Sequence, residues 1–200
     1  MMGGDTLEFK YMQINNKLQY SSKRRSSKDI IAIVFHDTGN TGKGAGALNH
    51  QKYLTHATRP GSAHYYVDEN YIIQPIGDSY IAYSVGDTHS LKNRTRPDLN
   101  NSNTISVELC INSDGNYKQA YTNSVELVKN LMVKFNIPIN NVVRHFDVSG
   151  KMCPNIMSKD NWKDWYKFKL DISKPIQYLI DLEKDSEFGG VCNACGRPYI

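Results

Sequence analysis

The segment IIAIVFHD at residues 30–37 constrains the fold more than any other part of the sequence. Its first six residues are apolar, and most of them are β-branched. An apolar run of this length that stops at polar and glycine-rich sequence is typical of a strand buried on both faces. Residues 30–37 therefore predict a central strand of a sheet, with His36 at its end.

Further strands and helices are predicted in mixed order. Residues 63–68 and 71–76 read as two short strands of a hairpin or meander. Residues 104–111 alternate in polarity, which predicts a strand with Glu108 on the face opposite its apolar set. Helices are predicted at 47–57, at about 123–135 with an Asn123–Glu126 capping pair, and at 161–172 and 176–184 around Pro175, with a short strand at 141–145. This order predicts an α/β fold with a central mixed β-sheet flanked by α-helices.

Charge and hydropathy exclude several classes of protein. The 200 residues carry a net charge of +4, without the long basic stripe of a nucleic-acid binder, so nucleic acid is not an expected partner. The adjacent Lys23, Arg24 and Arg25 are interpreted as a solvated loop. No apolar run approaches the ~18 residues of a membrane span, and the first residues lack a signal-peptide core. We therefore expect synthesis in the cytosol without a signal peptide.

Two histidines end predicted strands, and a cysteine follows the second one in VVRHFDVSGKMCP at residues 142–154. His36 or His145 alone is more often a satisfied polar residue, and Cys153 alone fits a small apolar residue, half of a disulfide or a thiolate ligand. Together they match zinc, whose catalytic sites keep three protein ligands and an open position for water. Gly150 favours a turn and Pro154 stiffens its exit. The spacing thus permits a metal site without requiring one.

Four motifs in order carry a resemblance to a known family. They are VFHDTG at 34–39, SAHYYVDEN at 62–70, NTISVELC at 103–110 and RHFDVSGKMCP at 144–154. Over roughly residues 28–170 the chain resembles the zinc-dependent N-acetylmuramoyl-L-alanine amidases of the amidase-2 type, which include catalytic domains of phage endolysins and bacterial autolysins. The resemblance implies the fold of peptidoglycan-recognition proteins, and bacterial peptidoglycan as the partner.

The resemblance also implies roles for individual residues. It makes His36, His145 and Cys153 ligands of Zn²⁺. It places Glu108 and Lys151 beside the metal, where Glu108 would move the proton of water and Lys151 would stabilise an oxyanion. The residues alone leave an alternative for each: Glu108 could form a cross-strand ion pair, and Lys151 could be a solvated lysine of a loop. His64 stands where relatives carry a tyrosine or histidine, with substrate orientation and a structural hydrogen bond both open.

The implied reaction is hydrolysis of the amide between the lactyl group of N-acetylmuramic acid and the L-alanine of the stem peptide. The polar loop at 84–103 is expected to line the substrate groove, with Gly86 and Asp87 as candidate substrate-binding residues. The alternative is a non-catalytic peptidoglycan-recognition module on the same fold, and retention of Cys153 argues against it. No HExxH motif supports a generic metalloprotease. The expected route to the cell wall is release by phage or host lysis.

The extent of the resemblance and a change of composition near the C-terminus together divide the chain into three parts. Residues 1–27 are assigned to an N-terminal extension, residues 28–187 to the zinc amidase catalytic domain, and residues 188–200 to a linker and stub. The stub holds Cys192 and Cys195 in a CxxC pair, whereas a structural zinc ribbon needs two such pairs. A truncated wall-binding module, a redox-sensitive pair and a half-site shared with a second subunit all remain open. Cys110 is predicted to be a buried free cysteine.

Overall fold

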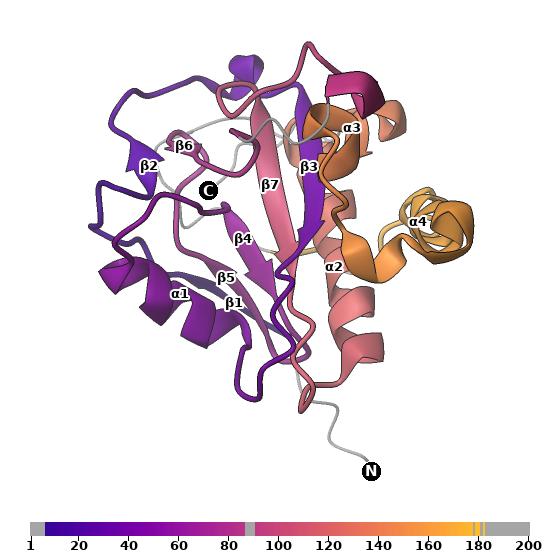
Figure 1. Cartoon of the computed structure of the whole chain (residues 1–200), viewed down its shortest axis with the longest axis horizontal. Helices are drawn as coiled ribbons and strands as arrows, with labels where there is room; N and C mark the ends of the chain where they lie inside the picture. The colour runs from indigo at the N-terminus through magenta and orange to yellow at the C-terminus, as the bar shows by residue number, and fades with distance from the viewer. Residues whose placement is uncertain (1–6, 87–90, 178, 181, 183–200) are drawn as a thin grey trace.

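The centre of the protein is a six-stranded mixed sheet with the strand order β1-β5-β4-β7-β3-β8 (Figure 1). A computed structural model describes residues 7–86, 91–177, 179–180 and 182. The strands of this sheet are β1 (Glu8–Tyr11), β3 (Ala32–Asp37), β4 (Tyr65–Val67), β5 (Tyr71–Gln74), β7 (Thr104–Leu109) and β8 (Val142–Arg144). A second, two-stranded sheet pairs β2 (Tyr20–Ser21) with β6 (Ile81–Ala82).

Strand β3 is buried along its whole length, as its sequence predicts. It pairs in parallel with β7 on one side and with β8 on the other. Successive side chains of a strand point to opposite faces. Phe35 packs in the core that contains Phe168, while Val34 belongs to a second cluster with Val143 and Val148. Both faces of β3 are therefore covered, which explains its unbroken apolar pattern.

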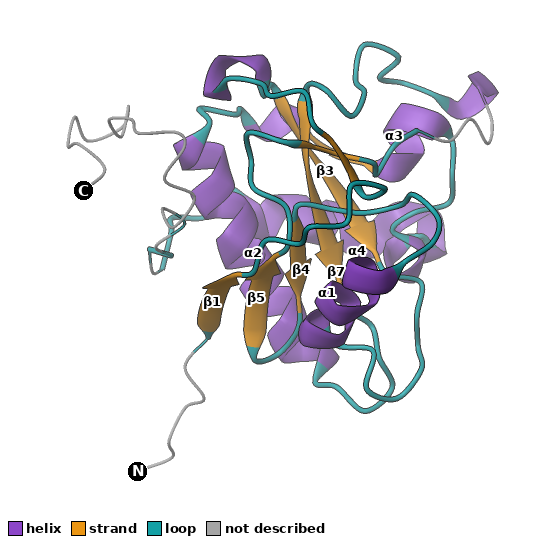
Figure 2. Cartoon of the chain, turned by 90° about the vertical axis from the view of Figure 1, so that its left-hand side faces the viewer, coloured by secondary structure: helices purple, strands orange, loops and turns teal. Residues whose placement is uncertain are grey.

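Helices cover both faces of the sheet (Figure 2). They are α1 (Ala47–His56), α2 (Tyr117–Lys134), α3 (His145–Ser149) and α4 (Lys159–Ile172), with 3₁₀ turns η1 (Ser27–Asp29), η2 (Leu91–Asn93), η3 (Ile139–Asn141) and η4 (Asn155–Met157). Apolar residues of α2 and α4 share one core cluster, and those of α1 belong to another. Strands β4 and β5 are antiparallel, which confirms the hairpin and makes the sheet mixed. Within the described residues, no helix is long and apolar enough to cross a membrane.

Two helix predictions need correction. Helix α2 begins at Tyr117, and its N-cap is Asn116, whose side chain accepts a hydrogen bond from the Gln119 amide. The predicted Asn123–Glu126 capping pair is wrong, because Asn123 lies inside the helix and donates to the carbonyl of Asp68 at 2.9 Å. The described residues of the predicted helix at 176–184 are not helical, and the others lie outside the described residues.

The segment before β3 is part of the folded domain wherever the structure describes it. Strand β1 adds to the main sheet in parallel with β5, and Ile14 and Tyr20 are buried in the α1 core. Arg25 is only 8% exposed, so the interpretation of residues 23–25 as a solvated cluster is wrong for this residue. Residues 1–27 are predicted to be an extension because the family resemblance begins near residue 28. In the structure, pairing of the short strands β1 and β2 joins the described part of this segment to the rest of the fold.

Candidate active site

Polar side chains lie side by side where the parallel strands end. Tyr66 of β4 is the register partner of Glu108 in β7. Glu108 is in turn the partner of His36 in β3. His145 directly follows β8, the other parallel neighbour of β3. Because parallel strands bring their carboxyl ends to one edge of a sheet, the register alone gathers these four residues in one place.

His36, His145 and Cys153 converge into one buried cluster. One ligand atom from each lies within 4.8 Å of the others. The Sγ atom of Cys153 is 3.7 Å from Nδ1 of His36, and the two imidazole centroids are 4.6 Å apart. A tetrahedral zinc ion with usual bond lengths holds a nitrogen and a sulfur ligand roughly 3.6 Å apart. The spacing therefore suits a metal ion shared by these side chains.

A tight turn brings Cys153 back to the strand ends. Helix α3 ends at Gly150, whose φ of 81° lies in the left-handed region that glycine adopts without strain. The amide of Phe146 donates to the carbonyl of Cys153 at 3.0 Å and closes the loop. Asp37 fixes the exit, because its Oδ2 accepts a hydrogen bond from the Ile156 amide at 2.7 Å. One short segment thus supplies two of the three candidate ligands.

The electrostatics of the cluster favour a bound cation. Burial lowers the pKa of His36 well below its usual value, so the imidazole is neutral, as a ligand must be. Burial and then Asp37 raise the pKa of the Glu108 carboxyl well above its usual value. Burial also raises the pKa of the Cys153 thiol, with Glu108 the next cause. A thiolate at Cys153 is unfavourable in these surroundings unless a positive ion lies beside it. The two imidazoles and the thiol therefore fit a bound divalent metal ion.

A cavity of about 830 Å³ opens over this cluster. One side, the metal wall, consists of His145, Lys151, Met152, Cys153 and Asn155. Another side, the second wall, consists of residues 60–62, Tyr83, Ser84, Gly86 and Asn101. His36, Glu108 and Tyr66 also line the cavity. The cavity thus gives the metal cluster access to a substrate.

Some of the predicted site residues line the cavity and others do not. Lys151 and Gly86 line the cavity, and Asp87 lies outside the described residues. His64 is 1% exposed and is not among the described lining residues. Its Nδ1 lies 2.9 Å from Oγ of Ser106. Of the two roles that the sequence left open for His64, these contacts are those of the structural hydrogen bond, and substrate orientation by His64 stays a prediction.

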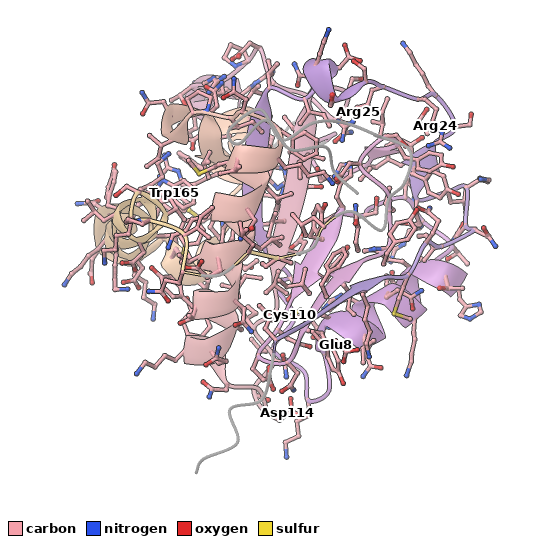
Figure 3. The ribbon with its side chains drawn as sticks, turned by 180° about the vertical axis from the view of Figure 1, so that it is seen from behind. Glu8, Arg24, Arg25, Cys110, Asp114 and Trp165 are labelled. Atoms are coloured by element: carbon pink, nitrogen blue, oxygen red, sulfur yellow. The ribbon has the colours of Figure 1, made fainter. Side chains whose placement is uncertain are left out.

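Sequence reasoning missed two residues of the site. Asp37 follows His36 directly and both lines the cavity and anchors the Cys153 loop. Tyr66 lines the cavity beside Glu108, and its ring stacks on His50 at a centroid distance of 5.2 Å. Strand alternation could have identified Tyr66. Side chains two positions apart in a strand lie on the same face of the sheet, and Tyr66 follows His64 by two positions. Cys110 is a buried free cysteine, as predicted (Figure 3).

Comparisons with known proteins agree on one family. Residues 26–156 match the family described as N-acetylmuramoyl-L-alanine amidase. The amidase CwlH of Bacillus subtilis is 35% identical over 134 residues, which cover 66% of this chain and 50% of CwlH. The amidase XlyA of the same organism is 35% identical over 132 residues, covering 66% of this chain and 41% of XlyA. The chain thus spans about half the length of the curated relatives it matches.

Solved structures of similar proteins match more completely. The catalytic domain of XlyA superposes with a TM-score of 0.69 at 30% identity, covering 82% of this chain and 99% of that domain. The structure of PlyL gives a TM-score of 0.64 at 30% identity, covering 84% of this chain and 96% of that chain. The described fold is therefore that of these endolysin domains. This chain belongs to the N-acetylmuramoyl-L-alanine amidase family.

Proposed function

We propose that this chain hydrolyses peptidoglycan at the amide between the lactyl group of N-acetylmuramic acid and the L-alanine of the stem peptide. The convergence of His36, His145 and Cys153 beside Glu108, at the floor of an open cavity, carries the proposal. The relatives named above are called N-acetylmuramoyl-L-alanine amidases, which supports the choice of bond. Bacterial peptidoglycan is the partner.

Zinc is the metal we assign to the cluster. Two imidazoles and one thiolate form a donor set that zinc prefers, and three protein ligands leave a fourth position for chemistry. Zinc bound there supplies Lewis acidity, which lowers the pKa of a water molecule and polarises a carbonyl. The remaining steps are carried by side chains of the chain itself.

Glu108 moves the proton. Its Oε2 atom is buried and has no hydrogen-bond partner among the described residues, so it is available to a water molecule in the cavity. Glu108 accepts a proton as that water attacks the amide carbonyl, and then gives it to the departing nitrogen of L-alanine. The C–N bond breaks, the second proton of the water also passes to the amine, and the products are a lactyl carboxylate and the α-ammonium group of L-alanine.

Lys151 stabilises negative charge that develops on the carbonyl oxygen. It lines the metal wall, and its charge counteracts the burial that raises the pKa of Glu108. The attraction between the Lys151 ammonium and the carbonyl oxygen strengthens as negative charge develops on that oxygen in the transition state. Lys151 is therefore expected to affect kcat more than substrate binding. Gly86 contributes backbone surface to the second wall, where the uncleaved part of the substrate binds. Asp87 is proposed as its neighbour in substrate binding.

Mass analysis of digested peptidoglycan tests the proposal. The purified chain is expected to release stem peptides with new N-terminal L-alanine and without new reducing sugar ends. New reducing ends would identify a glycosidase, and new amino groups within the stem would identify an endopeptidase. Binding without any cleavage would identify the recognition module instead, and each of these results contradicts the amidase assignment.

The site of action is the bacterial cell wall, reached after lysis releases the protein from the cell that makes it. Cell-wall fragments added to the purified chain should therefore be digested without any further protein. A chain that digests isolated walls only after proteolytic processing would contradict this part of the proposal.

A further inference from the structure

Residues 19–25 hold the second wall of the cavity in place. This segment lies just before the family match, which begins at residue 26. It includes β2 of the small sheet, and Arg24 and Arg25 at its end are labelled in Figure 3. Its contacts reach both parts of the second wall, the loop at 60–62 and the loops at 83–86 and 101.

Gln19 holds the first part. It is fully buried, and its Nε2 donates to the carbonyl of Arg59 at 2.8 Å. The hydroxyl of Ser62 donates to the carbonyl of Gln19 at 2.5 Å. Ser62 is in turn bonded to Tyr83, whose amide donates to Oγ of Ser62 at 3.0 Å. Gln19 therefore anchors a chain of hydrogen bonds that ends in two lining residues.

Arg25 holds the second part. Its Nη1 donates to the carbonyls of Asn101 at 3.1 Å and Thr104 at 2.7 Å. The side chain of Asn101 accepts hydrogen bonds from the amides of Ser84 at 3.0 Å and Val85 at 2.9 Å. The guanidinium thus fixes Asn101, and Asn101 fixes the loop that carries Ser84.

The remaining nitrogens of Arg25 tie the wall to the sheet. Its Nε donates to the carbonyl of Asp78 at 2.9 Å, and its Nη2 lies 2.8 Å from Nε2 of His64. A guanidinium only donates, so Nε2 of His64 is the acceptor in its contact with Arg25. A buried cation is tolerated only when its donors are satisfied. Arg25 meets this condition through the carbonyls of Asp78, Asn101 and Thr104 and through His64.

We infer that residues 19–25 form a clamp that positions the second wall for the uncleaved part of the substrate, with Gln19 and Arg25 as positioning residues. The identity of that substrate rests on the proposed amidase function. The second wall supplies no candidate metal ligand and no proton carrier among its described residues. Displacing it weakens binding of the ground state and the transition state alike, which raises KM and leaves kcat nearly unchanged.

Variants of the clamp test this inference in the full chain. Arg25→Gln is expected to raise KM for a soluble muropeptide about tenfold with kcat within about twofold. Gln19→Leu removes the side-chain bond to the Arg59 carbonyl but keeps the backbone carbonyl that Ser62 contacts, so it should act in the same direction with a smaller effect. Arg25→Lys restores a cation and part of the carbonyl contacts, so its KM should lie between those of Arg25→Gln and the wild type. Zinc content should stay at the wild-type level in all three.

Hydrogen exchange gives a readout that does not depend on activity. The amides of Ser84 and Val85 are expected to exchange faster in Arg25→Gln than in the wild type, because Asn101, which accepts their hydrogen bonds, is released. Lys129→Met is the matched control, since Lys129 is a buried cation of α2 that pairs with Glu126 at 2.7 Å, away from the cavity. It should lower thermal stability while leaving KM and exchange at Ser84 and Val85 unchanged.

The outcomes separate the two proposals. Unchanged exchange at Ser84 and Val85 in Arg25→Gln, or a loss confined to kcat, would overturn the clamp. An equal KM change in Lys129→Met would also overturn it, since general destabilisation would then account for the effect. A wild-type chain that cleaves no peptidoglycan would overturn the amidase function, and the exchange measurement would still decide whether the clamp holds the wall.

Discussion

The two walls of the cavity are built in different ways. The metal wall comes from one segment, residues 145–155, which follows β8. A bond between near neighbours, Phe146 and Cys153, closes its loop, and one long-range bond, from Ile156 to Asp37, anchors its end. The second wall comes from three separate loops. Its supports span long stretches of sequence, for example the 76 positions between Arg25 and Asn101.

The two walls are therefore expected to have different roles, the metal wall in the reaction and the second wall in binding the substrate. The reacting groups sit on regular parallel strands and on one tight turn, where register and a glycine determine their places. The second wall depends on hydrogen bonds from a segment that lies outside the family match. Changes in the metal wall should therefore affect turnover, and changes in the second wall should affect binding.

The largest effect is expected from the metal wall itself. Cys153→Ser should lose the bound metal, and with it roughly a thousandfold or more of the activity, because the Lewis acid is lost. Metal analysis and wall digestion measure both effects. Cys110→Ser is the control, since Cys110 is also a buried free cysteine but lies outside the cluster. A Cys153→Ser protein that keeps its metal would contradict the ligand assignment.

The next effect is expected at the proton carrier. Glu108→Gln keeps the shape of the side chain and removes its basicity, so kcat should fall by about 10²–10⁴-fold while the metal is retained. Steady-state kinetics with metal analysis distinguish this from loss of the metal centre. Full turnover in Glu108→Gln would show that another group moves the proton.

A smaller effect is expected at the exposed end of the metal wall. Lys151→Met should lower kcat by roughly 10²-fold, because the positive charge near the carbonyl oxygen is lost. KM should change little. If Lys151→Met mainly raised KM, Lys151 would bind the substrate and the transition state equally well. The metal wall would then also contribute to substrate binding, which contradicts the division of roles between the two walls.

The smallest effect is expected away from both walls, at Asp171 of α4. Lys167, Lys174 and Tyr121 hold the pKa of this carboxyl well below its usual range. A depressed folded-state pKa stabilises the protein above the unfolded value of about 4, and this contribution is lost as the pH falls below it. Asp171→Asn should cost about 1 kcal/mol or less near pH 7, because the lysine partners are exposed.

Denaturant unfolding at several pH values checks the Asp171 prediction. The stability difference between wild type and Asp171→Asn should shrink as the pH falls from about 6 towards 2. Activity at pH 7 should be equal in the two proteins. A difference that grows towards low pH would contradict the assigned sign.

Part of the fold and most of the candidate chemistry could be predicted from sequence. The apolar run of β3 and the alternation of β7 predicted two central strands, and the positions of His36 and Glu108 follow from them. The start of α2 could not be predicted, because Tyr117 to Gln119 lack an apolar stripe and the helix depends on Asn116 as its cap. The contacts of His64 could not be predicted either, because burial and the neighbouring Arg25 decide them.

The sequence by itself determined the donor types of the candidate ligands and the turn between His145 and Cys153, because these are local properties. Tertiary structure alone decided that Tyr66, Glu108 and His36 lie in one row, since the row is a matter of register between distant strands. It alone also decided that Arg25 is buried. No local pattern shows that one guanidinium will meet carbonyls contributed by residues 78 and 101–104.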